Sequence, residues 1–154
     1  MRVTVRAYGT AAVVVVVDQL SKAWAIDHLH GLQTAPLLPG LLQMRLVFNN
    51  GAAFSLWTGG GVALGLVSLL VSIALVIWIA GSAPLRHWQW LGSGLLLGGA
   101  LGNGLDRWRL GTVVDFLEFV PVSFPIFNAA DVAINLAVAC FLMDLWQQRR
   151  HGQG

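Results

Sequence analysis

The chain has 154 residues, of which 56% are hydrophobic and only 10% are charged. Soluble domains carry about 25% charged residues, so this composition argues against a soluble protein and for one integral membrane domain covering residues 1–154. The formal net charge is +2, and the Lys and Arg residues are spread along the chain. The sequence contains no cluster of basic residues that would indicate binding to nucleic acid.

Four apolar segments predict four transmembrane helices, because crossing a bilayer takes about 20 largely apolar residues. They cover about residues 7–26, 61–80, 90–105 and 126–146. Asp18 and Lys22 interrupt the first segment, so its last two turns do not fit an ordinary lipid-facing helix. Gly94, Gly98 and Gly102 stand at four-residue spacing in the third segment, which predicts close helix packing. The predicted fold class is therefore an all-α membrane protein.

The connections between these segments contain two candidate strands. Residues 42–48 alternate apolar and polar side chains, which is typical of a half-buried strand, and a turn is expected at "NNGAAF", residues 49–54. A second strand is expected at residues 112–120, before Pro121. Together they predict a small extracytoplasmic β platform at the membrane surface.

The charges orient the predicted helices. With four spans, one side receives basic residues in short loops and tails, namely Arg2, Arg6, Arg86, Arg149 and Arg150. Six of the seven acidic residues fall on the other side. Basic residues in short loops favour the cytoplasmic side, so both termini are expected in the cytoplasm.

Polar side chains gather at the outer ends of the predicted spans. They form three sets at helical spacing: Asp18 with Lys22, Asn103 with Asp106 and Arg107, and Asn128 with Asp131. Ionisable groups within spans are rare, point into the bundle and mark function. Three such sets at one depth therefore predict a functional site.

The chemistry of that site is expected to come from carboxylates. No Ser or Cys has a plausible His partner, and no HExxH is present, so neither a metal nor a cofactor is expected. Asp115 lies in the second candidate strand, and Asp131 lies about 7–8 Å into the fourth span when counted from Ile126 at 1.5 Å per residue. Two aspartates held close can share one proton and activate a water for attack on a peptide carbonyl.

Two other functions fit some of these features. A transporter or channel subunit would use Asp18 and Asp131 for protons or cations, but such proteins often show internal repeats, and none is found. A scaffold would use the polar sets only to specify helix packing, which gives no reason for Asp115.

Five motifs in order resemble those of the bacterial lipoprotein signal peptidases, or signal peptidase II. They are "DQLSK" (18–22), "NNGAAFS" (49–55), "GGALGNGLDR" (98–107), "VVDF" (113–116) and "FNAAD" (127–131). The resemblance runs the length of the chain. It implies a monomeric aspartyl protease with four spans in the bacterial cytoplasmic (inner) membrane, surrounded by lipid and with its active site at the extracytoplasmic face.

The resemblance also implies a substrate and roles for particular residues. The substrate would be a prolipoprotein with a diacylglyceryl group on its Cys, cut just before that Cys. Asp115 and Asp131 would be the catalytic pair. The residues that bind substrate or support the site would be Asp18, Lys22, Asn49, Gly51, Asn103, Asp106, Arg107 and Asn128.

Overall fold

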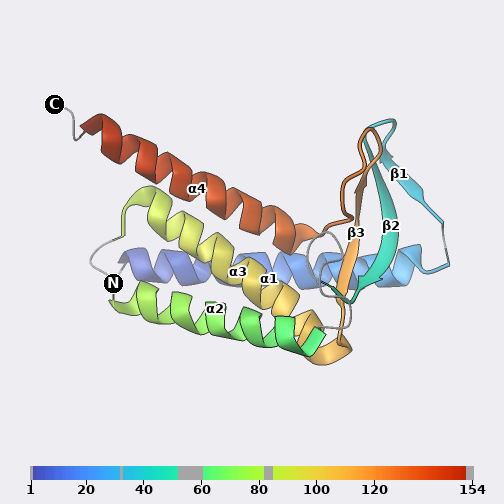
Figure 1. Cartoon of the computed structure of the whole chain (residues 1–154), viewed down its shortest axis with the longest axis horizontal. Helices are drawn as coiled ribbons and strands as arrows, with labels where there is room; N and C mark the ends of the chain where they lie inside the picture. The colour runs from blue at the N-terminus through green and yellow to red at the C-terminus, as the bar shows by residue number, and fades with distance from the viewer. Residues whose placement is uncertain (1, 32, 52–60, 82–84, 152–154) are drawn as a thin grey trace.

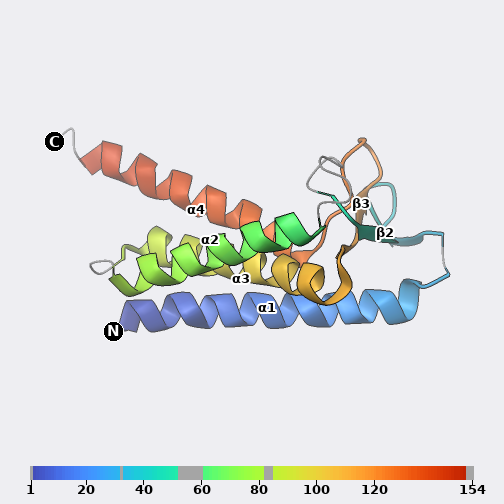
Figure 2. The same ribbon diagram turned by 60° about the horizontal axis from the view of Figure 1, so that its bottom comes forward.

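The computed structural model describes residues 2–31, 33–51, 61–81 and 85–151. Their elements follow one another as α1 (Arg2–Leu29), β1 (Ala35–Leu38), β2 (Leu42–Asn49), α2 (Gly61–Gly81), α3 (His87–Leu110), β3 (Val113–Phe119) and α4 (Ala129–His151). The helices run roughly along one axis, and the strands stand at one end of them (Figure 1). Both termini lie at the opposite end, as the turned view in Figure 2 also shows.

Helix α3 lies in the middle of the bundle and contacts each of the other three helices. A Cβ added at Gly94 would lie 2.5 Å from the backbone oxygen of Ala7 in α1, and one at Gly99 would lie 2.7 Å from that of Ala130 in α4. One at Gly104 would lie 3.1 Å from a side chain of α2. The close packing expected from the glycines is confirmed, and it occurs on three sides of α3.

Three of the helices formed by the described residues are long and apolar enough to cross a membrane. These stretches are Thr4–Leu29, Gly61–Gly81 and Ala129–Arg150. The expected third span, now part of α3, does not reach the same hydropathy because glycines and polar residues replace long apolar side chains. A helix enclosed by three others needs little lipid-facing surface, which explains this composition. Apolarity alone thus supports three of the four expected spans.

Helix α4 begins at Ala129, three residues later than the span expected from Ile126. Phe127 instead pairs with β3: its N–H donates to the oxygen of Leu117 at 2.9 Å, and its own oxygen accepts from the N–H of Leu117 at 2.9 Å. Asp131 is therefore the third residue of the helix, not about 7–8 Å into it as the expected start implied. Helices α1 and α3 extend three to five residues beyond each end of the expected spans, whereas α2 ends one residue later than expected.

The strands form an antiparallel sheet in the order β1-β2-β3. Both predicted strands are confirmed, with Leu42 opposite Phe119 and Asn49 opposite Val113. The sheet is attached to the bundle where Phe116 packs with Ala25 and Leu29 of α1. β1 was not predicted. Of the turn expected at 49–54, residues 52–54 lie outside the described residues.

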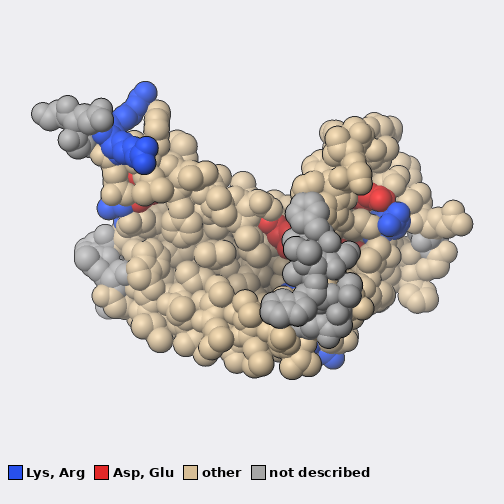
Figure 3. Space-filling view, in the orientation of Figure 1, with Lys and Arg blue, Asp and Glu red and all other residues tan. Residues whose placement is uncertain are grey.

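On the visible face, charged atoms appear at the end with the termini, on the sheet and, as acidic atoms, near the middle of the molecule, and the helical surface between this middle point and the termini is uncharged (Figure 3). At the end with the termini, Arg86 pairs with the buried carboxylate of Asp144 in α4. An uncharged helical surface between two charged levels is the pattern expected of a bundle that lies in a bilayer.

Candidate active site

Asp115 lies in the middle of β3, and its side chain points into the molecule with only 3% of the residue exposed. Its carboxylate accepts two hydrogen bonds from amide side chains. The Nδ2 of Asn49 donates to Oδ2 at 2.9 Å, and the Nδ2 of Asn128 donates to Oδ1 at 2.7 Å. Asn49 ends the neighbouring strand β2, so the pairing of β2 with β3 places this donor beside Asp115.

Asp131 lies in the first turn of α4, where it forms a reciprocal cap with Asn128. The Oδ1 of Asn128 accepts from the N–H of Asp131 at 3.0 Å, and the Oδ2 of Asp131 accepts from the N–H of Asn128 at 3.1 Å. This arrangement is a capping box, which satisfies N–H groups that have no partner within the helix. The other oxygen, Oδ1, accepts from the Nδ2 of Asn103 at 2.8 Å.

Asn128 therefore connects the two aspartates, donating through its side chain to Asp115 and through its backbone to Asp131. It is fully buried. Its Nδ2 also donates to the Oδ1 of Asn103 at 3.1 Å, and the Nδ2 of Asn103 in turn donates to Asp131. Two amide side chains thus link the candidate catalytic carboxylates in one hydrogen-bonded network.

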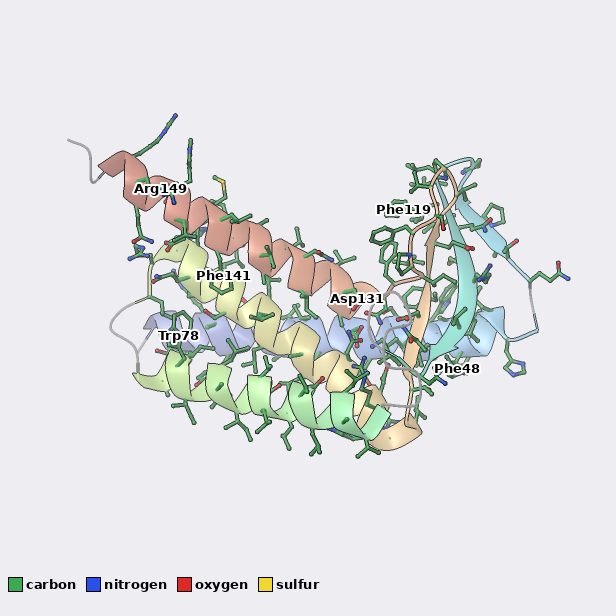
Figure 4. All side chains as sticks on the ribbon, in the orientation of Figure 1. Phe48, Trp78, Phe119, Asp131, Phe141 and Arg149 are labelled. Carbon is green, nitrogen blue, oxygen red and sulfur yellow. The ribbon has the colours of Figure 1, made fainter. Side chains whose placement is uncertain are left out.

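Both aspartates face a cavity of about 690 Å³. Its polar wall is formed by Asn49, Asn103, Arg107, Asp115, Asp131 and Asn135. Its apolar wall is formed by Val113, Phe119, Phe124, Pro125, Ile126, Phe127, Val132, Ile134 and Leu136. In Figure 4, Asp131 lies at the sheet end of α4 and Phe119 lies across from it on the sheet. The cavity can accept a ligand that is polar at one end and apolar at the other.

The environment of Asp115 suits proton exchange near neutral pH. Burial raises the pKa of its carboxyl most, and the negative charge of Asp131 raises it too, while the hydrogen bonds from Asn49 and Asn128 and the charge of Lys22 lower it; together these effects bring the pKa to about 6. A carboxyl in a cavity whose pKa is raised to about 6 can hold or release a proton during a reaction.

Behind the cavity, Lys22 occupies the centre of a buried charged cluster. Its Nζ lies 2.8 Å from the Oδ2 of Asp18, 2.8 Å from the Oδ2 of Asp106 and 3.0 Å from the Oδ1 of Asn103. Three acceptors use the three N–H groups of the ammonium. The contact with the oxygen of Asn103 also orients that amide so that its nitrogen faces Asp131.

The two carboxylates of this cluster also hold the backbone beside the candidate catalytic residues. The Oδ1 of Asp18 accepts from the N–H of Ala130 at 2.9 Å, immediately before Asp131. The Oδ2 of Asp106 accepts from the N–H of Val114 at 3.1 Å, immediately before Asp115. Asp18, Lys22 and Asp106 support the site from behind and do not line the cavity.

Arg107 connects α3 to the segment after β2. Its Nη1 donates to the oxygen of Asn103 and its Nη2 to the oxygen of Gly51, each at 3.4 Å. The N–H of Gly51 in turn donates to the Oδ1 of Asn49 at 2.9 Å, which fixes the amide that contacts Asp115. All ten residues expected at the site thus lie in or directly around it.

Some residues of the site were not expected. Gln19 donates through Nε2 to Asp106 at 3.0 Å and to Asp18 at 3.2 Å, joining the two supporting carboxylates. Its position directly after Asp18 in "DQLSK" could have indicated that Gln19 belongs to the site. No sequence pattern predicted the aromatic residues of the cavity wall, because the pairing of Phe127 with β3 is what brings them together. Within the described residues, no group of three or more His, Cys, Asp or Glu could hold a metal ion.

Comparison with known proteins identifies the family. Residues 10–147 match the sequence model described as signal peptidase (SPase) II. The chain belongs to the signal peptidase II family. It is 54% identical to the lipoprotein signal peptidase of Parasynechococcus marenigrum, over 94% of this chain and 92% of that one. It is 46% identical to that of Thermosynechococcus vestitus, over 86% and 85%.

Solved structures of bacterial membrane enzymes share the fold of this chain. A bacterial membrane enzyme determined by the in meso method at 2.3 Å resolution matches with a TM-score of 0.84 and 29% identity, over 93% of this chain and 88% of that one. A second, at 1.9 Å, matches with a TM-score of 0.79 and 30% identity, over 90% and 91%. The chain is thus an aspartic-type signal peptidase II with a mostly helical membrane fold.

Proposed function

We propose that Asp115 and Asp131 are the catalytic pair of this signal peptidase, and that it removes the signal peptide of a prolipoprotein by cutting before its diacylglyceryl-modified Cys. The observation that carries this assignment is the position of both carboxylates on one cavity that has a polar and an apolar wall. Peptide would lie along the polar wall and lipid along the apolar one.

In the proposed reaction, one carboxylate of the pair is ionised and the other holds a proton. The ionised group takes a proton from a water molecule as its oxygen bonds to the scissile carbonyl carbon. The protonated group donates to the carbonyl oxygen, and a proton then passes to the leaving nitrogen as the C–N bond breaks. The signal peptide leaves with a new carboxyl group, and the lipidated Cys gains a free amine.

The amides and Arg107 would position the substrate and the carboxylates. The hydrogen bonds from Asn49, Asn103 and Asn128 hold both carboxylates at fixed angles, which lowers the reorganisation needed during reaction. Arg107 lines the cavity, and its guanidinium would donate to a substrate carbonyl oxygen. Every part of this site comes from one chain, which favours action as a monomer.

The same proposal places α3 as a fourth span enclosed by the other three, with both termini in the cytoplasm. The sheet and the catalytic pair would then lie at the outer face of the bacterial cytoplasmic membrane. The termini and the sheet stand at opposite ends of the helices, which supports this orientation (Figure 2).

The test is cleavage of a synthetic lipidated precursor peptide by Asp115→Asn and Asp131→Asn. Each variant should lose activity by about a hundredfold or more, because an amide cannot exchange the proton. Asp144→Asn is the matched control, since it removes another buried carboxylate at the opposite end of the bundle. If either site variant cleaved at the rate of the control, the assignment of the pair would be wrong.

A further inference from the structure

The end of the sheet furthest from the bundle carries an exposed apolar surface, here named the apolar tip. Its residues belong to the β1–β2 hairpin and to the segment after β3, and each is between 46% and 59% exposed. They are Leu37, Leu38, Leu41, Val120, Val122 and Phe124. An exposed apolar cluster of this kind marks a surface that contacts another apolar phase.

The apolar tip is held together by specific contacts. In the hairpin turn, the N–H of Leu41 donates to the oxygen of Leu38 at 3.0 Å, and Gly40 adopts a φ of 75° after Pro39. This geometry suits the turn, because Pro fixes φ at its first central position and Gly accepts a positive φ at the second. The N–H of Val120 donates to the oxygen of Leu41 at 3.0 Å, which joins the two segments.

The two segments contain no charged residue. Residues 35–42 read "APLLPGLL" and residues 119–127 read "FVPVSFPIF". The nearest charged pair on the sheet, Arg45 with Glu118 at 3.2 Å, stands closer to the bundle. In Figure 3 the protruding end of the sheet is uncharged, and charged atoms appear only below it. Connections that face water are usually polar, so the apolar composition of these two segments indicates that the apolar tip contacts something other than water.

The position of the apolar tip indicates which partner this is. The strands cross the axis of the helices, so the tip projects sideways at the end where α2 and α4 begin (Figure 1). Residues 120–127 run on the side of the sheet that faces α4 and lead directly into it. The polar headgroup region of a bilayer extends about 5–8 Å beyond the hydrocarbon on each side. A surface at the ends of the spans and beside them lies at that level.

We propose that the apolar tip inserts into the headgroup region of the membrane leaflet beside α4, and that phospholipid is its partner. The sheet is then held at two places, by α1 at one end and by lipid at the other. Phe124 is shared with the cavity wall, but the other five residues of the apolar tip do not line the cavity, so the contact with lipid needs no substrate. The contact with lipid fixes the position of β3, and therefore of Asp115, along the membrane normal.

Site-directed spin labelling tests the proposal without measuring activity. Cys140 is the only cysteine of the chain, so a Cys140→Ala background allows one label at a chosen position. Labels are placed by Leu41→Cys, Val122→Cys and, as the matched control, Gln33→Cys, which is exposed between α1 and β1. Each protein is reconstituted in vesicles of phosphatidylethanolamine and phosphatidylglycerol, and the accessibility of the label to oxygen and to a water-soluble nickel complex is measured.

Labels at positions 41 and 122 should be severalfold less accessible to the nickel complex than the label at 33, with no substrate present. Adding Leu37→Glu and Leu38→Glu should return the label at 122 to water, because charges are driven out of the lipid. Three results would overturn the proposal: equal accessibility at 41 and 33, protection only after a lipidated precursor is added, or spin–spin broadening that shows a second copy covering the tip.

Discussion

The carboxylate of Asp18 accepts a hydrogen bond from the backbone N–H of Ala130, which lies 112 residues further along the chain. Asp106 accepts from the backbone N–H of Val114 in the same way. Each of these buried aspartates thus holds the residue that precedes a candidate catalytic aspartate. Lys22 lies between them and contacts both at 2.8 Å, so one side chain of α1 fixes the position of β3 relative to α4.

Replacing Lys22 by Met should therefore destabilise the protein strongly. The substitution leaves Asp18 and Asp106 buried without their counter-charge, a change that typically costs about 3–5 kcal/mol. Thermal unfolding in detergent measures the loss. The matched control is Arg45→Met, which breaks a pair with a half-exposed cation and should cost less than about 1 kcal/mol. Equal losses in the two variants would contradict the role given to Lys22.

Gly102→Ala should disturb the site without introducing a polar or charged group. Its Cβ would lie 2.5 Å from the Oδ2 of Asp18, so the carboxylate has to move away from Lys22. We expect a loss of about 1–3 kcal/mol in unfolding free energy, as for other overpacked sites, together with slower cleavage. Gly9→Ala in α1 is the control, since nothing lies within 4 Å of its added Cβ. It should leave activity unchanged, and a similar loss there would argue against a specific clash at Gly102.

Substitutions of Asn128 should separate capping of α4 from tuning of Asp115. Ser and Asp both cap helices about as well as Asn, so Asn128→Ser and Asn128→Asp should keep α4 folded by circular dichroism. Both remove a donor that lowers the pKa of Asp115, and Asp adds a negative charge beside it. The pH dependence of kcat/KM should move upward in the order parent, Ser variant, Asp variant. An unchanged profile in both would show that Asn128 does not act on Asp115.

The raised pKa of Asp115 also predicts how stability depends on pH. An acid whose pKa rises from 3.8 to about 6 on folding binds more protons in the folded state between those values, so its contribution to stability falls as pH rises through that window. The shift corresponds to a penalty on the order of 2–3 kcal/mol at neutral pH. Asp115→Asn removes it.

Unfolding of the parent and of Asp115→Asn should therefore be compared at about pH 4 and about pH 8. The stability of the variant relative to the parent should be greater at the higher pH. The comparison removes any cost of the substitution that is the same at both pH values, such as a lost hydrogen bond. A relative stability that did not change with pH would show that the pKa of Asp115 is not raised on folding.

Much of the site could be predicted from the sequence because its residues lie at helical spacing or in short motifs. Asp18 and Lys22 are four apart on one helix, and that local spacing alone predicts their contact. The alternation in β2 likewise predicted a strand, which is confirmed, and this strand pairs with β3. These features depend on neighbours within a few residues, which sequence patterns record directly.

Other features depend on contacts between distant segments and could not be predicted in this way. β1 has four residues, includes Pro36 and lies at the edge of the sheet, so it shows no alternation. The start of α4 depends on the pairing of Phe127 with Leu117, which removes residues from an otherwise continuous apolar segment. The position of α3 inside the bundle explains why it is less apolar than a lipid-facing span, and its neighbours are not visible in its own sequence.

The attachment of Asp18 and Asp106 to backbone N–H groups has a consequence for sequence variation at this site. Any residue except proline supplies such an N–H, so the polarity of the side chains at Val114 and Ala130 does not enter these two hydrogen bonds. Packing limits their size, but proline alone removes the donor. Positions 114 and 130 should therefore tolerate many small and medium apolar residues, but not proline.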